Sequence, residues 1–170
     1  MLEYKEISSI AGYEIDLRDL LIDSVEEGAS IGFVLPIESS QVDDYWLNVE
    51  SDLREGERKL YIVLEQQHVI GAVQLSLCSK ANGRHRGEVE KLMVKTQHRG
   101  KGISKPLMSM MEHAAQELGV SLLVLDTRKG DVASLLYQSI GYQQVGEIPQ
   151  FALSSNGELD ATVYFYKQLS

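Results

Sequence analysis

The sequence is poor in residues that cross-link a fold. Its single cysteine, Cys78, excludes an intramolecular disulfide and a cysteine metal cluster. Because Cys78 lies in a strand-like run, we expect a buried, unreactive thiol in a strand interior. No metal site is predicted, since the four histidines share no ligand spacing (His68, His85, His98 and His113). We expect the side chain of His98 to face solvent.

Long apolar runs and a basic leader are also missing. No stretch approaches the ~18 apolar residues of a membrane span, and no N-terminal segment pairs basic residues with an apolar run. These absences predict a cytoplasmic protein without a membrane partner.

Positive charge is scarce. The chain has 16 Lys and Arg against 25 Asp and Glu, which gives a formal net charge of -9. Nucleic-acid binding usually needs a basic face, so this balance argues against a nucleic-acid partner. An acidic surface would suit a cationic or amine ligand, although many proteins are acidic for unrelated reasons.

The length of 170 residues and the 44% hydrophobic fraction predict one globular domain over 1–170. Apolar periodicity and turn residues predict an α/β protein with a mixed sheet. Helices are expected at 13–26, 38–55, after residue 102, and after Asp131, which should cap the last one. Strands are expected at 60–65, 69–78, 88–94, 121–126, 142–146 and 159–169. A loop is expected between the last two strands, at residues 149–157.

The most informative segment is the hexapeptide Gln97-His98-Arg99-Gly100-Lys101-Gly102. It follows the strand-like residues 88–94 and precedes a helix-like run. A strand that enters a glycine-rich turn at a helix start exposes several backbone N–H groups, and the helix dipole adds positive potential there. The segment is therefore a candidate phosphate loop, although turns and helix starts also use glycine for structural reasons.

Two common phosphate motifs are excluded. The chain has no G-x-x-x-x-G-K-[ST], and Lys105 stands where a dinucleotide fingerprint needs glycine. The remaining pattern, Q/R-x-x-G-x-G/A after a strand, resembles the acetyl-CoA loop of the GNAT superfamily of N-acetyltransferases. Residues 71–75, 121–126 and 133–142 also resemble that family, the last as its A-x-x-x-Y-x-x-x-G-F/Y helix and turn.

The resemblance implies the GNAT fold, a central mixed β-sheet flanked by helices. It also implies an enzyme that uses acetyl-CoA as acyl donor and transfers the acetyl group directly to an amine. The cofactor-binding residues that it implies are Leu92, Met93, Val94, Gln97, His98, Arg99, Gly100, Lys101, Gly102, Ile103, Ser104, Ser134 and Tyr137.

Further segments are similar to the tabtoxin-resistance branch of the superfamily, which acetylates an amino-acid-like β-lactam toxin. They are residues 28–33, 74–78, 90–94, 125–127 and 160–162. This similarity implies toxin or antibiotic inactivation and a closed pocket for a compact amine. We expect residues 28–30, Phe33 and the 149–151 turn to border that pocket. The alternative for Phe33 is packing beneath the sheet. The substrate-binding residues expected are Ser30, Phe33, Glu88 and Asp126.

Two residues depart from the family pattern. Ser104 stands where many members have another glycine. Pro106 would kink a helix that begins at Lys101, but it would cost little in a helix that begins later. The sequence leaves these two alternatives open.

Three carboxylates are candidates for the base that deprotonates the amine. Glu88 aligns with the family's central-strand glutamate, and its alternative is a solvated strand residue. Asp126 ends a strand, where open α/β sheets place ligand groups, and its alternative is a turn cap or a pair with Arg128. Glu90 is weaker, and we expect it to point elsewhere on the strand. If Glu88 and Asp126 line one cleft, their repulsion should raise one pKa.

Tyr137 occupies the tyrosine of the family's helix pattern, where the phenol protonates the leaving thiolate of CoA. Ser134, one turn earlier, is expected to bind the pantetheine arm. Backbone groups of Leu92, Met93 and Val94 are expected to pair with pantetheine like an added strand. Their apolar run is compatible with a β-bulge that frees an N–H for the thioester oxygen.

The leading functional hypothesis is an acetyl-CoA-dependent N-acetyltransferase that acts on a primary amine of a small, amino-acid-like molecule. The alternatives are acetylation of protein lysines or N-termini, and a non-catalytic CoA-binding module. The joint presence of Glu88, Asp126 and Tyr137 argues against the last. A monomer and a homodimer are both compatible with the sequence.

Overall fold

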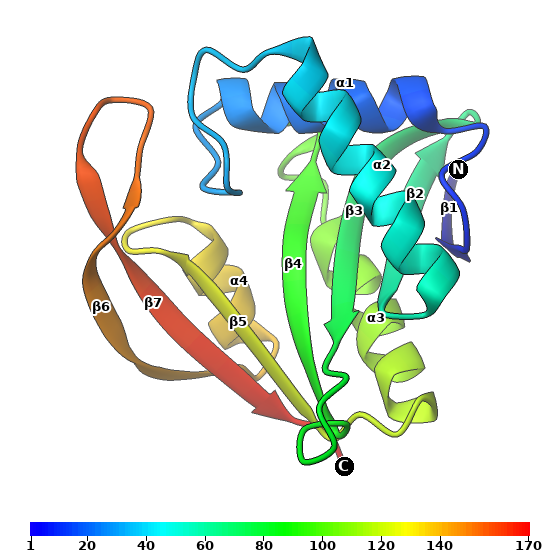
Figure 1. The fold of residues 1–170 in the computed structure, drawn as a ribbon, viewed down its shortest axis with the longest axis vertical. Coiled ribbons are helices and arrows are strands. Elements are labelled where there is room, and N and C mark those ends of the chain that lie inside the picture. Colours follow the sequence, from blue (N-terminus) through cyan, green and yellow to red (C-terminus); the bar gives the residue numbers. More distant parts are fainter.

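The computed structural model describes residues 1–170 and contains one seven-stranded sheet with helices on both faces (Figure 1). Its strands lie in the order β1-β2-β3-β4-β5-β7-β6, and only β4 and β5 run parallel. The strands are β1 (Leu2–Ile7), β2 (Arg58–Glu65), β3 (His68–Leu77), β4 (Arg86–Val94), β5 (Leu122–Arg128), β6 (Gln143–Leu153) and β7 (Leu159–Gln168). The helices are α1 (Glu14–Glu26), α2 (Ser39–Glu55), α3 (Ser104–Glu117) and α4 (Ala133–Ser139), with a 3-10 turn η1 (Thr96–His98). The predicted mixed α/β fold is confirmed.

Strands β2 and β3 are covered on both faces. Alternation along β2 sends Leu60 and Ile62 into a core beneath α1 and α2, and Tyr61 and Val63 into a second core on the α3 face. The neighbouring strand β3 is buried without interruption from Val69 to Leu75. This half of the sheet therefore forms a rigid support for β4 at its edge.

Strands β5 and β7 are covered on one face only, and β6 at the sheet edge is exposed at nearly every residue. Leu123, Leu125 and Phe165 join the core on the α3 face, whereas no residue of these strands belongs to the core beneath α1 and α2. The residues that alternate with them, including Asp126 and Thr162, lie on the other face. That face is left free to line a binding site.

The predicted loop over residues 149–157 is wrong in its extent, because β6 continues to Leu153. Its pairing with β7 slips between Ile148 and Ala152, and Gln150 takes a φ of 49° in this bulge. A bulge in an edge strand accommodates Pro149, which cannot donate to a ladder. The connection between the strands shrinks to residues 154–158.

The helix after the glycine loop begins at Ser104, which settles the two alternatives for Pro106. Pro106 is the third residue of the first turn, where a backbone N–H would have no acceptor within the helix. It therefore costs α3 no hydrogen bond and introduces no kink. Gly119 follows the helix with a φ of 85°, as a residue that ends a helix requires. None of the helices has the length and apolarity needed to cross a bilayer.

Candidate active site

The site begins where β4 and β5 separate. The two strands pair only at Arg86–Leu122, Gly87–Leu123 and Glu88–Val124, and beyond Glu88 they diverge (Figure 1). The predicted bulge lies on β4 at this point, because Lys91 and Leu92 together oppose Val73 of β3. An extra residue in one strand bends it and interrupts its ladder. The bulge thus leaves backbone groups near Leu92 available to a ligand.

A cavity of about 540 Å³ lies beside the diverging strands. Its wall includes the end of β4, the glycine loop, the start of α3, residues 28–29 and the start of α4. Of the predicted cofactor-binding residues it contains Leu92, Met93, Val94, His98, Arg99, Gly100, Gly102, Ile103 and Ser104. Gln97, Lys101, Ser134 and Tyr137 do not line it, and the α4 residues in its wall are Ala133 and Leu136.

The glycines of the loop have the conformation that the motif requires. Gly100 and Gly102 have φ values of 76° and 73°, and no other atom lies within 4 Å of a Cβ placed on either residue. The left-handed backbone favours glycine, and the open space lets an anion approach the main chain. The loop therefore has the shape of an anion-binding turn at the start of α3.

The sequence led us to expect that His98 faces solvent, and this expectation was wrong. Its side chain is 14% exposed, and Nε2 lies 3.6 Å from Glu65 Oε1. Nδ1 is buried without a hydrogen-bond partner. His98 is the last residue of the 3-10 turn η1, which turns its side chain away from solvent. The spacing of the glycines does not reveal this turn.

A second cavity, of about 360 Å³, adjoins the first and shares with it Leu92, Arg128 and Ala133, among others. It brings together four predicted site residues: Ser30, Glu88, Asp126 and Tyr137. Residues of the β6 bulge and of β7, including Phe151 and Thr162, complete its wall. Segments more than 100 residues apart in sequence thus meet at one site.

Phe33 does not line this second cavity. It borders a smaller hollow of about 220 Å³ and packs edge-on against Tyr45, with 5.6 Å between the ring centroids. The alternative considered for Phe33, packing within the fold, therefore describes its position better than a place in the acceptor pocket.

Glu88 is the carboxylate most open to the second cavity and has no hydrogen bond or ion pair with another residue. Partial burial raises the pKa of Glu88, and repulsion from Glu90 and Asp126 raises it further. Because the cavity is open, water screens this repulsion until a ligand displaces it. We expected one raised pKa if Glu88 and Asp126 line one cleft, and the pKa of Glu88 is raised.

Asp126 neither caps a turn nor pairs with Arg128. Its carboxylate accepts a hydrogen bond of 2.6 Å from Thr162 Oγ1, across the β5–β7 ladder. Thr162 is buried, so this contact fixes the carboxylate at the cavity wall. Asp126 is thus held in place while Glu88 remains free.

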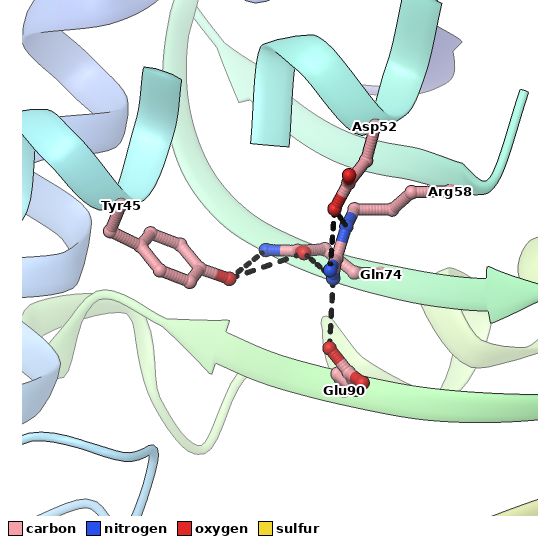
Figure 2. A network of polar contacts seen from close by, with 5 residues as sticks. All are labelled: Tyr45, Asp52, Arg58, Gln74 and Glu90. Carbon is pink, nitrogen blue, oxygen red and sulfur yellow. Dashed lines mark hydrogen bonds and ion pairs between the residues drawn. The ribbon is translucent and has the colours of Figure 1, made fainter. Parts of the chain in front are cut away.

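Glu90 does not point away from Glu88, and the sequence-based expectation was wrong. Residues two apart on a strand share a face, and both glutamates line the second cavity. Glu90 Oε2 forms an ion pair with Arg58 Nη1 at 2.8 Å. The same Nη1 donates a hydrogen bond of 2.8 Å to Oε1 of the buried Gln74. Asp52 accepts two bonds from the same guanidinium, and Tyr45 bonds Gln74 (Figure 2). This network occupies Glu90 and leaves it poorly suited to accept a proton.

Tyr137 projects from α4 to the wall of the second cavity. Its ring is 7% exposed and packs against Tyr142 and Phe165, with centroids 5.8 and 6.0 Å apart. Its hydroxyl has no protein hydrogen-bond partner. Burial, aided by Asp131 and Asp126, raises the pKa of the phenol, so it stays protonated and can donate.

Arg128, which sequence reasoning did not select, joins the loops around both cavities. Its guanidinium donates to Gly28 O at 2.8 Å, to Asp131 Oδ1 at 3.0 Å and to Ser154 Oγ at 3.3 Å. Asp131 therefore does not cap α4, whose N-cap is Val132 without a side-chain bond. An arginine at the end of a largely apolar strand was the available signal, but its partners Gly28 and Ser154 lie 100 and 26 residues away.

Cys78 lies just beyond β3 rather than inside a strand. It is half-buried, and its sulfur accepts a 3.4 Å contact from Arg86 Nη2. The thiol lines neither of the two adjoining cavities, which leaves it outside the candidate chemistry.

Comparison with known proteins agrees with this geometry. The sequence profile of the acetyltransferase (GNAT) family matches residues 17–142. Human N-acetyltransferase 8B is 30% identical over 100 residues, which are 58% of this chain and 44% of that protein. The chain thus spans less than half the length of this curated relative.

Two solved structures share the fold across nearly the whole chain. Ribosomal-protein-alanine N-acetyltransferase from Brucella melitensis has a TM-score of 0.80 at 20% identity, covering 99% of both chains. The Salmonella typhimurium protein yncA, solved with its cofactor acetyl-CoA, has a TM-score of 0.81 at 19% identity, covering 99% of this chain and 94% of that one. With the family profile spanning most of the sequence and the fold shared throughout, the chain belongs to the acetyltransferase (GNAT) family.

Proposed function

We propose that this protein is an acetyl-CoA-dependent N-acetyltransferase that acetylates the primary amine of a small, amino-acid-like molecule. The observation that carries the proposal is the junction of the two cavities at Leu92 and Ala133. One cavity is walled by an anion-binding loop, and the other by candidate acid and base residues. A donor in the first and an acceptor in the second would meet at this junction.

Acetyl-CoA supplies an activated acetyl group as a thioester. Backbone groups of Leu92, Met93 and Val94 bind the pantetheine arm, and the loop at Gly100 and Gly102 binds the pyrophosphate. The N–H groups near the β4 bulge face the thioester oxygen, where negative charge develops during attack. Each assignment rests on the position of these residues in the wall of the first cavity.

The acceptor amine attacks after losing a proton, and Glu88 accepts that proton directly or through a water. Its free carboxylate and raised pKa support this role over Asp126, which Thr162 holds, and over Glu90, which Arg58 holds. Tyr137 donates its phenolic proton to the sulfur as the C–S bond breaks, and the nitrogen, which becomes positively charged on attack, gives up its second proton to restore the phenol, directly or through a water. The products are then an amide and a neutral thiol.

The acceptor cavity supports a small acceptor. Its volume is about 360 Å³, enough for an amino-acid-like molecule, and residues 29–32 and the β6 bulge close two of its sides. The similarity of residues 28–33 and 160–162 to the tabtoxin-resistance branch points the same way, because both segments reach this cavity. An amino-acid-like toxin or antibiotic is therefore the acceptor class we favour.

An assay of CoA release against a panel tests the proposal. The panel contains free amino acids, polyamines, a β-lactam toxin of the tabtoxin class, and peptides with free N-termini or lysines. We expect the highest kcat/KM among the free amino acids or the toxin. Peptide acetylation at higher kcat/KM than any small amine would overturn the small-molecule assignment and favour protein acetylation. Tight acetyl-CoA binding without turnover on any amine would indicate a non-catalytic module.

A further inference from the structure

The acceptor cavity contains a lysine that the proposed chemistry does not use. Lys91 lies in the β4 bulge, directly before the residues assigned to pantetheine, and lines the same cavity as Glu88 and Asp126. Its backbone has a φ of 52°, a left-handed conformation that glycine adopts at much lower cost. A long charged side chain kept at such a position, beside a cavity, points to a role for its ammonium group.

Lys91 Nζ has no direct ion-pair partner, although the charges of Glu90, Glu88 and Asp126 act on it across the cavity. No carboxylate oxygen lies within 4 Å of it, and it makes no hydrogen bond to another residue. It lies 5.4 Å from the centroid of the Tyr45 ring and 3.7 Å from the place of a Cβ on Gly32, so one side rests on an aromatic face beneath the 28–36 loop. Burial lowers the pKa of this lysine, as expected for an ammonium with incomplete solvation.

Apart from Glu88, the other charged groups of the cavity already have partners. Arg128, the second cation of its wall, donates to Gly28, Asp131 and Ser154. Glu90 is held by Arg58, Asp126 by Thr162 and Asp160 by Ser154. Lys91 and Glu88 are the charged residues of the wall without a hydrogen-bonded partner. The cavity thus offers one available cation and one available anion.

We propose that Lys91 binds the carboxylate of a zwitterionic acceptor while the acceptor's amine lies toward Glu88. This inference rests on the proposed acetyltransferase function and narrows it to amines that carry a negatively charged group. If Lys91 only stacked on Tyr45, the negatively charged group of the acceptor would not affect kcat/KM. Selectivity between otherwise identical amines therefore separates the two roles.

The experiment uses matched pairs of acceptors, each an L-amino acid and the amine obtained by removing its carboxylate. Suitable pairs are phenylalanine with phenethylamine, methionine with 3-(methylthio)propylamine, and lysine with cadaverine. Steady-state kcat and KM are measured by CoA release for the wild type and for Lys91→Met. Lys91→Arg tests rescue by a second cation, and Lys80→Met, in the exposed turn between β3 and β4, removes the same charge far from the site.

We expect the wild type to prefer the amino acid in at least one pair. In Lys91→Met, KM for that amino acid should rise roughly 10- to 100-fold, the range for losing a charge-assisted hydrogen bond, with little change for the matching amine. Lys91→Arg should recover most of the preference, and Lys80→Met should keep all of it. Lys91→Gly, which suits the bulge, should fold at least as stably as the wild type and show the same selectivity loss as Lys91→Met.

Four results would overturn the assignment. An unchanged preference in Lys91→Met, or equal kcat/KM within every wild-type pair, would reduce Lys91 to a structural contact. An equal fall in kcat for both members of a pair would place Lys91 in proton transfer instead of recognition. The absence of turnover with every amine, despite acetyl-CoA binding, would remove the proposed function and with it the role of Lys91.

Discussion

Strands β3 and β6 belong to the same sheet, yet their side chains meet opposite surroundings. β3 is buried along most of its length between α1 and α2 on one face and α3 on the other. β6 is exposed at nearly every residue and forms the edge of the half that is covered on one face. One half of the sheet is thus a packed support, and the other presents an uncovered face.

The candidate active site lies at the border between these halves. β4 belongs to the packed half and carries Glu88, Glu90 and Lys91, whereas β5 belongs to the other half and carries Asp126. Polar residues are tolerated here because the α1 and α2 core ends at β4. The comparison indicates that the packed half fixes geometry, while the open half leaves room for an acceptor.

The largest expected effect is on turnover. Tyr137→Phe should lower kcat by ~10²–10⁴, the usual scale for a positioned acid or base. Its free energy of unfolding should change little, because the phenylalanine ring keeps the packing on Tyr142 and Phe165 and the hydroxyl has no protein partner to lose. Stopped-flow measurement of acetyl transfer, with acetyl-CoA affinity as control, tests this. A near-wild-type rate with chemistry rate-limiting would remove Tyr137 from the acid role.

The second prediction addresses the contrast between the halves directly. Leu60→Ala removes a fully buried side chain from β2 and should lower the free energy of unfolding by about 2–5 kcal/mol. Ile148→Ala, on β6 at 44% exposure, should change it by no more than about 0.5 kcal/mol. Urea denaturation of the two variants measures both values. Similar losses at the two positions would show that β6 is covered in solution, by a second copy or another partner.

The third prediction concerns the glycine loop, which follows β4 of the packed half and precedes α3. Gly102→Asp should weaken acetyl-CoA binding roughly 10- to 100-fold by calorimetry, because it puts a negative charge beside the pyrophosphate. Gly102→Ala is the matched control, since a Cβ there meets no neighbouring atom. Asp adopts positive φ more readily than Ala, so backbone strain would not account for a larger loss in the Asp variant. Equal affinities in the two variants would contradict the loop assignment.

The smallest expected effect is a displacement of the pH–rate profile. Glu88 acts as a base only when ionised, so activity should fall as the pH drops through its pKa, which burial and the neighbouring carboxylates raise. Asp126→Asn removes one repelling charge and should lower the pKa of Glu88. The acidic limb of kcat/KM then moves to lower pH.

Glu88→Gln provides the control for this profile, because it should abolish that acidic limb. If the limb persists in Glu88→Gln and disappears in Asp126→Asn, the base is Asp126. Such a result would move the proton acceptor from the packed half of the sheet to the open half.

Much of the fold could be read from local sequence. The predicted helices at 13–26 and 38–55 agree with α1 and α2 within one residue, because apolar spacing over a few turns decides which face packs. The glycine loop could also be identified, because glycine is the residue that most readily adopts the positive φ found at Gly100 and Gly102. Glu88, Asp126 and Tyr137, which the sequence singled out as candidates, line one cavity, and their catalytic roles stay predictions.

Other features depended on contacts that no local pattern encodes. The extension of β6 to Leu153 follows from pairing with β7, which overrides the turn tendency of Pro149. Arg128 was missed because its partners Gly28 and Ser154 come from two distant loops. Lys91 was missed because the sequence indicated a bulge only through the apolar run 92–94, and the register of β4 on β3 was needed to place Lys91 in it.

The sequence by itself indicated the glycine loop and the helices, because each depends on residues within a few positions of one another, and its resemblance to a family supplied Glu88, Asp126 and Tyr137 as candidates for acid and base. Only the tertiary structure decided which carboxylates are free and which are held, and that Lys91 faces the acceptor cavity without a partner. The reason is physical. Whether a charge is available depends on the groups that the closed chain brings within hydrogen-bond distance, as Arg58 does for Glu90 across 32 residues and Thr162 for Asp126 across 36.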